Sequence, residues 1–167
     1  VIPLLASSSV LNKKAQEEYM LLFPLYSGSV QTIIDKGRGY PSCSFTDGVE
    51  VVHIVRQAIE GLCAVHEAGY RHADFKPANI LLSADRQQVV LTDFGSATQL
   101  SRVISDRHEA LSAQDEAAVS TTASYRSPEL FNTPSSCTLD GKCDVWSFGC
   151  LLYAMFFSRT PFETAGE

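Results

Sequence analysis

Residues 71–79 read RHADFKPAN, and residues 92–95 read TDFG. Asp74, Lys76 and Asn79 lie in the first stretch, and Asp93 lies in the second. Two short apolar runs, ILL at 80–82 and VVL at 89–91, lie between them, separated by polar residues, which is the pattern of a β-hairpin. Because a hairpin folds back on itself, we expect Asp93 to return to the neighbourhood of Asp74.

This arrangement predicts a site for phosphoryl chemistry. Two carboxylates, a carboxamide and an ammonium would face one point. Hard oxygen ligands of this kind suit Mg²⁺, which takes one or two carboxylates together with phosphate oxygens and water. A remaining carboxylate can accept a hydroxyl proton, and a lysine can neutralise phosphoryl charge. A single Asp is more typical of a turn or a cap, so the prediction depends on the four residues together.

The flanking sequence predicts a mixture of strands and helices. We expect a short strand at 1–5, loops at 7–9 and 12–18, and a buried strand at 19–23 that ends at Pro24. A short helix is expected at 30–35 and a loop at 37–44. A long helix should then begin at Thr46 or Asp47 and end at Gly69. Its spacing of three and four predicts one buried face, formed by Val51, Val52, Val55, Ile59, Leu62 and Val65.

The second half of the chain contains an unusual polar stretch and a very apolar helix. Residues 95–120 are rich in Ser, Ala and Gln and are too long for a plain loop in a compact domain, which is typical of a functional segment. Residues 144–157 are apolar nearly all round, which predicts a helix buried in the middle of the domain.

The composition sets broad limits on the class of protein. The chain has 167 residues, 45% of them hydrophobic, and a net charge of −6. It therefore fits one globular domain or part of one, and its acidic balance argues against nucleic acid as a partner. No apolar run reaches the roughly 18 residues of a membrane helix. Five scattered cysteines predict neither a disulfide framework nor a zinc site, as expected of a cytoplasmic protein.

In these motifs the chain resembles the eukaryotic protein kinases. The kinase catalytic loop, D-F-G metal site and A-P-E element correspond to HADFKPAN at 72–79, DFG at 93–95 and SPE at 127–129. Thr122 and DVWSFG at 144–149 match two further kinase features. The resemblance implies an α+β, protein-kinase-like fold, mostly the α-helical C-lobe with the last strands of the N-lobe and the hinge, truncated at both ends. It divides the chain into the end of the N-lobe (1–23), the hinge (24–26) and the C-lobe (27–167).

The resemblance also assigns catalytic roles. Asp74 would be the catalytic base that orients the substrate hydroxyl, and Lys76 would contact the γ-phosphate. Thr122 would hydrogen-bond both. Asp144 would accept hydrogen bonds from the backbone of the catalytic loop.

The implied cofactors are ATP and Mg²⁺. Asn79 and Asp93 would hold the metal. Phe23 falls at the gatekeeper position, with Pro24, Leu25 and Tyr26 as the hinge beside adenine, and Leu81 would form the floor under the ring. Proline fits the first hinge position because that position contributes only a carbonyl.

The implied activity is phosphorylation of protein serine and threonine hydroxyls, since Lys76 is typical of serine/threonine kinases. Two alternatives remain open. One is a pseudokinase scaffold that binds partners without transferring phosphate. The other is a small-molecule kinase of the aminoglycoside or choline type, against which Lys76, Thr122 and the SPE element count because they serve a peptide-binding platform.

The activation segment narrows the resemblance. EALSAQDEAA at 109–118, followed by SYRSPELF at 124–131, is similar to the Numb-associated kinase family, above all to its Golgi-associated branch, whose members carry myristoyl and palmitoyl groups. This implies Golgi or membrane association of the parent protein through an N-terminal acyl signal that is not in this chain. It also implies a helix in the insert that packs against the lower lobe. Leu111 and Ala118, seven residues apart, are expected on one face of that helix.

Two departures from the family pattern are visible. Ala73 stands where the family has arginine, and an arginine is found at position 71 instead. Because that family arginine pairs with a phosphorylated activation loop, we hypothesise that activity here does not depend on loop phosphorylation. In addition, no glycine-rich loop or strand lysine is found ahead of the hinge. We therefore expect the isolated chain to be poorly stable and inactive, and the activity to belong to the full-length protein.

Overall fold

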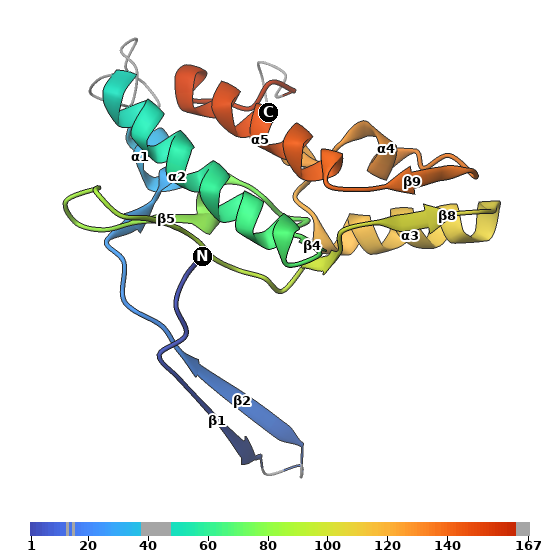
Figure 1. The fold of residues 1–167 in the computed structure, drawn as a ribbon, viewed down its shortest axis with the longest axis horizontal. Helices are drawn as coiled ribbons and strands as arrows, with labels where there is room; N and C mark the ends of the chain where they lie inside the picture. The colour runs from blue at the N-terminus through green and yellow to red at the C-terminus, as the bar shows by residue number, and fades with distance from the viewer. Residues whose placement is uncertain (13, 15, 38–47, 163–167) are drawn as a thin grey trace.

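The computed structural model describes residues 1–12, 14, 16–37 and 48–162. A two-stranded hairpin projects from a larger body in which helices pack around short antiparallel strands (Figure 1). The expected loop at 37–44 falls almost wholly outside the described residues, and so do the expected helix caps Thr46 and Asp47. The α+β fold class is confirmed, since the strands form small antiparallel sheets and are grouped along the chain apart from the main helices.

The projecting hairpin consists of β1 (Ala6–Leu11) and β2 (Glu17–Leu22). The strands pair antiparallel, with Ala6 opposite Leu22 and Leu11 opposite Glu17. The prediction of a strand at 1–5 and a loop at 7–9 was therefore wrong, because the serines belong to the strand. Pairing with β2 decides this register, and local propensity at exposed positions is too weak to oppose it.

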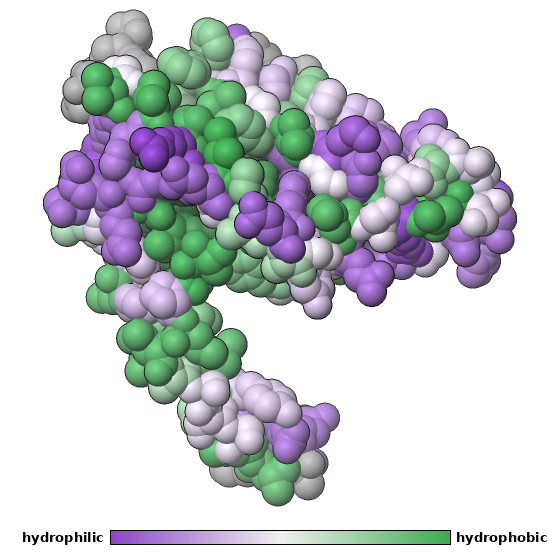
Figure 2. Space-filling model, viewed as in Figure 1, coloured by the Kyte–Doolittle hydropathy of each residue, from purple (hydrophilic) through white to green (hydrophobic). Residues whose placement is uncertain are grey.

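The prediction that residues 19–23 are buried was also wrong. Both strands are exposed along their whole length, and the side chains of Tyr19 and Leu22 are 70% and 58% exposed. Hydrophobic surface is visible along the hairpin and where it joins the body (Figure 2). A strand is buried only when a second layer covers it, and the apolar run alone cannot show whether that layer is present.

The larger body contains a first hydrophobic core beneath its longest helices. The core joins α1 (Val30–Gly37), α2 (Gly48–Glu67) and α5 (Lys142–Phe157) to a sheet of β3 (Gly28–Ser29), β5 (Ile80–Leu82) and β6 (Val89–Leu91), in the order β3-β5-β6. Fully buried members include Ile54, Ile80, Leu91 and Leu151. The expected helix at 30–35 and the expected hairpin of 80–82 with 89–91 are both confirmed.

Helix α2 follows its predicted periodicity with two exceptions. Val51, Leu62 and Val65 are buried, whereas Val52 is 66% and Ile59 is 37% exposed. The predicted face was thus slightly too wide, because the short strands beneath α2 cover only a narrow strip of it. Gly69 ends the helix as expected: its φ is +86°, and its N–H donates to the His66 carbonyl over 2.9 Å.

A second, smaller core lies beside the first. It is built from β8 (Arg102–Ile104), β9 (Cys137–Leu139), α3 (Arg107–Ser120), α4 (Pro128–Phe131) and the start of α5. The two-stranded sheet of β4 (Tyr70–Arg71) and β7 (Thr98–Gln99) and the 3₁₀ turns η1 (Pro77–Asn79) and η2 (Ala123–Tyr125) complete the body.

The insert does contain a helix, but its inward face is not the predicted one. Ala110, Ala113 and Ala117 of α3 are buried, whereas Leu111 is 43% exposed and Ala118 is exposed. Small side chains allow α3 to lie close against β8 and α4, so its large apolar residue points outward. Helix α3 begins at Asp106, whose side chain accepts a hydrogen bond from the Glu109 N–H.

Helix α5 is less buried than its composition predicted. Leu151, Ala154 and Met155 lie in the first core, but Val145 and Phe156 are 59% and 54% exposed. The two cores cover only one side of the helix in the described residues, so the apolar composition overstated its burial.

Candidate active site

The loop after β4 is fixed by a carboxylate from α5. Asp144 is 1% exposed, and its Oδ2 and Oδ1 accept hydrogen bonds from the N–H groups of His72 (2.8 Å) and Ala73 (3.0 Å). Asp144 therefore accepts hydrogen bonds from the backbone of the catalytic loop, as expected from the resemblance. Ala73 has a φ of +65°, in the left-handed region that alanine rarely adopts. The two bonds to Asp144 hold the loop in this strained conformation.

His72 joins the same loop to the segment that carries Asp93. Its side chain is completely buried, and its Nε2 lies 2.9 Å from the Thr92 carbonyl oxygen. Its ring lies 5.2 Å from that of Phe94 and 6.1 Å from that of Phe75. The ring therefore serves as a packed spacer between the two motifs.

Asp74, Lys76 and Thr122 meet in one hydrogen-bonded cluster. The Lys76 ammonium lies 2.6 Å from Oδ2 of Asp74 and donates to the Thr122 hydroxyl over 2.8 Å. Oδ1 of Asp74 accepts from the Thr122 hydroxyl (2.7 Å) and from the Thr122 N–H (2.9 Å). Residues that lie 46 and 48 positions apart in the chain are thereby joined at one carboxylate.

The cluster keeps Asp74 ionised at neutral pH. Burial on its own raises the pKa of this carboxyl, but hydrogen bonds from Lys76 and Thr122 and the positive charge of Lys76 together lower the pKa below its usual value. The ionised carboxylate is the form that can accept a proton from a hydroxyl group.

Asn79 and Asp93 supply oxygen atoms suited to Mg²⁺. The Asn79 amide donates from Nδ2 to the Asp74 backbone carbonyl (2.9 Å) and to Oδ2 of Asp74 (3.4 Å), so Oδ1 is the atom of this amide that could coordinate a metal ion. The Thr92 N–H donates to the Asn79 carbonyl over 3.0 Å, so the residue after Thr92, Asp93, begins beside Asn79. Asp93 has a φ of +62° and an exposed side chain.

This donor set fits the metal. A carboxylate and an amide oxygen are hard ligands, and Mg²⁺ keeps several waters or phosphate oxygens in its shell. Among the described residues, no group of three or more His, Cys, Asp or Glu side chains could hold a metal ion.

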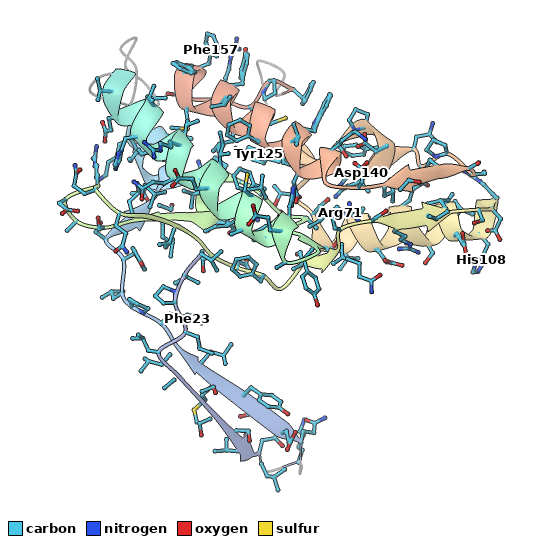
Figure 3. The ribbon with its side chains drawn as sticks, viewed as in Figure 1. Phe23, Arg71, His108, Tyr125, Asp140 and Phe157 are labelled. Atoms are coloured by element: carbon cyan, nitrogen blue, oxygen red, sulfur yellow. The ribbon has the colours of Figure 1, made fainter. Side chains whose placement is uncertain are left out.

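The residues expected to surround adenine lie where the hairpin meets the body. Phe23 is on that link (Figure 3) and is 38% exposed, and the Ser27 N–H then donates to the Leu82 carbonyl over 3.0 Å. Pro24, Leu25 and Tyr26 line a hollow of about 460 Å³ together with residues of the β5–β6 turn. Leu81 is half-buried and lies on the face of β5 opposite to that of its buried neighbours Ile80 and Leu82. It does not line that hollow.

Three features of the site were not apparent from the sequence. His66 of α2 places Nε2 2.8 Å from Oδ2 of Asp144, so α2 also contacts the residue that fixes the loop. Ser147 donates to the Tyr125 carbonyl over 2.8 Å and fixes η2 on α5. Arg71 is 5% exposed, although arginine is rarely buried. All three depend on contacts between segments far apart in the chain, for which local pattern gives no signal.

Within the described part of the chain, no helix combines the length and apolar character needed to cross a membrane.

Comparison with known proteins gives a consistent family match. The sequence pattern of the family described as "Protein kinase domain" matches residues 7–167. The chain is 38% identical over 164 residues to "Serine/threonine-protein kinase 16" of Mus musculus, covering 95% of this chain and 52% of that protein. The protein of the same name in Homo sapiens is 39% identical over 154 residues, with 89% and 48% covered.

A third relative matches this chain over a shorter stretch. "Serine/threonine-protein kinase ppk13" of Schizosaccharomyces pombe is 44% identical over 94 residues, which is 56% of this chain and 27% of that protein. The chain thus spans about half the length of the first two curated relatives that it matches.

Proposed function

Because the chain belongs to the protein kinase family, we propose that the full-length protein transfers the γ-phosphate of ATP to serine and threonine hydroxyls of a protein substrate. One observation carries this proposal: the Asp74 carboxylate, the Lys76 ammonium and the Thr122 hydroxyl lie within 2.6–2.8 Å of one another. The names of the three relatives given above, each a serine/threonine-protein kinase, support it.

Each member of the cluster has a distinct task in this proposal. Asp74 is ionised, so it orients the attacking hydroxyl and accepts its proton. Lys76 places a positive charge beside the same point, where it stabilises negative charge on the transferred phosphoryl group. Thr122 ties both side chains to the segment that receives the substrate, so substrate position and base position are coupled.

We propose Asn79 and Asp93 as the ligands of Mg²⁺. When bound, the metal ion neutralises phosphate charge and orients the nucleotide for in-line transfer. The hydrogen bonds from the Asn79 side-chain amide to Asp74 set the direction of the Asn79 side chain. The backbone hydrogen bond from Thr92 to Asn79 sets the distance between the two strands of the hairpin at this end.

The nucleotide base is proposed to lie at the link between hairpin and body. In this proposal Phe23, Pro24, Leu25 and Tyr26 flank the adenine ring, and Leu81 lies beneath it. The half-buried position of Leu81 on β5, next to the strand that continues from the link, supports this placement. We likewise propose the division into residues 1–23, 24–26 and 27–167, which the projecting hairpin supports (Figure 1).

A protein substrate is favoured over a small molecule by the platform that follows Thr122. Turn η2 is held on α5 through Ser147, and Arg126 donates to the Thr121 carbonyl (2.9 Å) and lies 4.7 Å from the centre of the Phe131 ring. Such a braced, partly exposed segment next to Asp74 suits an extended peptide. The net charge of −6 argues against nucleic acid as a substrate.

The test measures phosphate transfer by the full-length protein from labelled ATP to peptides that carry Ser, Thr or Tyr acceptors. We expect turnover on Ser and Thr peptides, and a loss of roughly a hundred- to ten-thousandfold in Asp74→Asn. Asp85→Asn is the matched control, because Asp85 lies in the exposed β5–β6 turn and bonds only locally. Asp93→Asn should raise the Mg²⁺ concentration needed for half-maximal rate.

Three results would contradict the proposal. Unchanged turnover in Asp74→Asn would remove the proposed base. Phosphorylation of aminoglycosides or choline in place of peptides would favour a small-molecule kinase. Tight ATP binding without any turnover would favour a pseudokinase scaffold.

We also propose, from the resemblance to the Golgi-associated kinase branch, that the full-length protein associates with Golgi membranes through N-terminal acyl groups. Fractionation of cells that express it, with and without hydroxylamine treatment to remove thioester-linked palmitate, tests this. Recovery in the soluble fraction in both cases would contradict it.

A further inference from the structure

One peptide unit after α3 contacts the catalytic cluster at one end and an arginine at the other. The unit joins Thr121 to Thr122. Its N–H belongs to Thr122 and donates to Oδ1 of Asp74 over 2.9 Å, and its carbonyl oxygen belongs to Thr121 and accepts from Nη2 of Arg126 over 2.9 Å. Because the C=O and N–H of a trans peptide unit point in opposite directions, Arg126 and Asp74 hold the same plane from its two ends.

Arg126 contacts Thr121 at a second point. Its Nε donates to the Thr121 hydroxyl oxygen over 2.5 Å, so the guanidinium bonds both the side chain and the backbone of that residue. The Thr121 hydroxyl donates in turn to the Ala117 carbonyl near the end of α3 over 2.8 Å. A guanidinium presents its donors in a rigid planar fork, so two bonds to one residue fix the position of that residue more closely than a single bond does.

The surroundings of Arg126 direct its charge to these carbonyl and hydroxyl oxygens. The side chain is half-buried, and its Cζ lies 4.7 Å from the centre of the Phe131 ring, so that ring covers one face of the guanidinium. Within the part of the chain that the structure describes, no ion pair joins Arg126 to a carboxylate. The charge of Arg126 is thus not neutralised by a described acidic side chain.

A simpler role for Arg126 would be to stabilise the end of α3. Its Nη2 lies 3.5 Å from the Ala118 carbonyl oxygen, and a cation near a helix C-terminus is favourable. That distance is the longest of the three that Arg126 makes to oxygen atoms, and the two shorter ones both reach Thr121, which follows the last residue of α3. The geometry therefore favours a role at the 121–122 peptide unit over a role in the helix.

We propose that Arg126 is a positioning residue for phosphate transfer, because through the 121–122 peptide unit it orients the N–H that holds the Asp74 carboxylate. This inference rests on the proposed function, in which Asp74 is the base. The cation also polarises the carbonyl, which makes the N–H at the other end of the unit a stronger donor. Without Arg126 the unit is free to rotate, and Asp74 loses one of its two bonds from Thr122.

The first measurement follows the Thr122 amide of the full-length protein by NMR and hydrogen exchange, and it does not depend on phosphate transfer. Arg126→Met keeps an apolar stem and removes every donor. We expect the amide proton resonance to move upfield and its exchange to become at least about tenfold faster. Arg126→Lys keeps the charge and should restore part of both signals. Arg102→Gln is the matched control, because Arg102 bonds to Glu116 of α3, so neither signal should change.

The second measurement is the rate of phosphate transfer to a serine peptide. In Arg126→Met we expect kcat to fall roughly tenfold with KM for ATP unchanged, because the position of the base changes and nucleotide binding does not. Thr121→Val separates positioning from stability. It removes the hydroxyl that bonds Ala117 but keeps the carbonyl that bonds Arg126, so it should lower Tm while reducing kcat by less than about threefold.

Three results would overturn the proposal. Unchanged Thr122 amide signals in Arg126→Met would show that Arg126 does not hold the peptide unit. An equal fall of kcat in Thr121→Val would show that lost stability explains the effect. A higher KM for ATP with unchanged kcat would place the role of Arg126 in nucleotide binding.

Two milder variants apply if Arg126→Met fails to fold. Arg126→Lys alters the fork, and Phe131→Leu removes the ring that covers the guanidinium, so both should shift the Thr122 amide resonance in the same direction by less. No shift in either variant would also overturn the proposal. Amide signals that respond to Arg126 in a protein that transfers no phosphate would contradict the proposed kinase activity alone, so the two failures are distinguishable.

Discussion

Replacement of Asp144 by asparagine tests the idea that one buried carboxylate fixes the catalytic loop. The side chain is 1% exposed, and it accepts hydrogen bonds from the N–H groups of His72 and Ala73 and lies 2.8 Å from His66 Nε2. Asparagine has almost the same shape, but only one of its two terminal atoms can accept. One of the two backbone N–H groups would then face an NH₂ group.

The magnitude follows from these contacts. A buried donor left without an acceptor costs about 1–3 kcal/mol, and the remaining bond loses the charge that strengthened it, which adds about 1 kcal/mol. We therefore expect Asp144→Asn to lower the free energy of unfolding by about 2–4 kcal/mol. The strained φ of +65° at Ala73 depends on the same bonds, so the loop should relax and Asp74 should leave its position.

The assay is urea unfolding of the full-length protein, together with hydrogen exchange at the His72 and Ala73 amides and the rate of phosphate transfer. Asp140→Asn is the control, because Asp140 lies just before the same helix, is partly exposed and bonds mainly to Lys142, so it should cost less than about 1 kcal/mol. Equal unfolding energies for the two variants, or unchanged exchange at the two amides, would refute the reasoning.

Three further predictions concern the cluster and the backbone. Thr122→Ala removes the hydroxyl between Asp74 and Lys76 and should lower kcat/KM by roughly ten- to a hundredfold, whereas Thr122→Ser should restore most of it; equal rates for the two variants would show that the hydroxyl is not used. Because the pKa of Asp74 is lowered on folding, its contribution to stability is full above the unfolded value of about 3.9 and is lost as the pH falls through the lower folded value. The unfolding free energy of Asp74→Asn should therefore change less with acidification, and parallel pH profiles would contradict this. Gly69→Ala should destabilise by about 1 kcal/mol because the φ of Gly69 is +86°. Gly149→Ala should stabilise by up to about 1 kcal/mol, because outside the adjacent backbone of α5 no atom of the described residues lies within 4 Å of the added Cβ; thermal unfolding measures both.

Much of the site could be predicted because its signals are local. The spacing of Asp74, Lys76 and Asn79 and the hairpin that follows are contiguous in the chain, and hairpin geometry brings Thr92 back to Asn79. The role of Asp144 was identified through resemblance, and the two backbone bonds agree with it. Among the described residues no hydrogen bond or ion pair joins Asp93 to Asp74 or to Asn79, so the return of Asp93 to the neighbourhood of Asp74, and the metal site of Asn79 and Asp93, stay predictions.

Other predictions failed where burial depends on what packs against an element. The apolar run at 19–23 does form most of a strand, yet that strand is exposed because none of the described residues forms a second layer over the hairpin. In α3 the large Leu111 points outward and three alanines point inward, although the larger apolar side chain would be expected to be the buried one. Val52 and Phe156 are exposed for the same reason: hydrophobicity says that a side chain favours burial, and only its neighbours decide whether burial is available.

The amino-acid sequence by itself determined the order of the motifs, the β5–β6 hairpin and the residue types that face it, since these depend on spacing along one short stretch. The tertiary structure alone decided the contacts that make the site work: Thr122 on Asp74 and His66 on Asp144. These contacts involve residues tens of positions apart in the chain. They form only when the two hydrophobic cores pack and close the long segments between those residues, and no local sequence pattern encodes that packing.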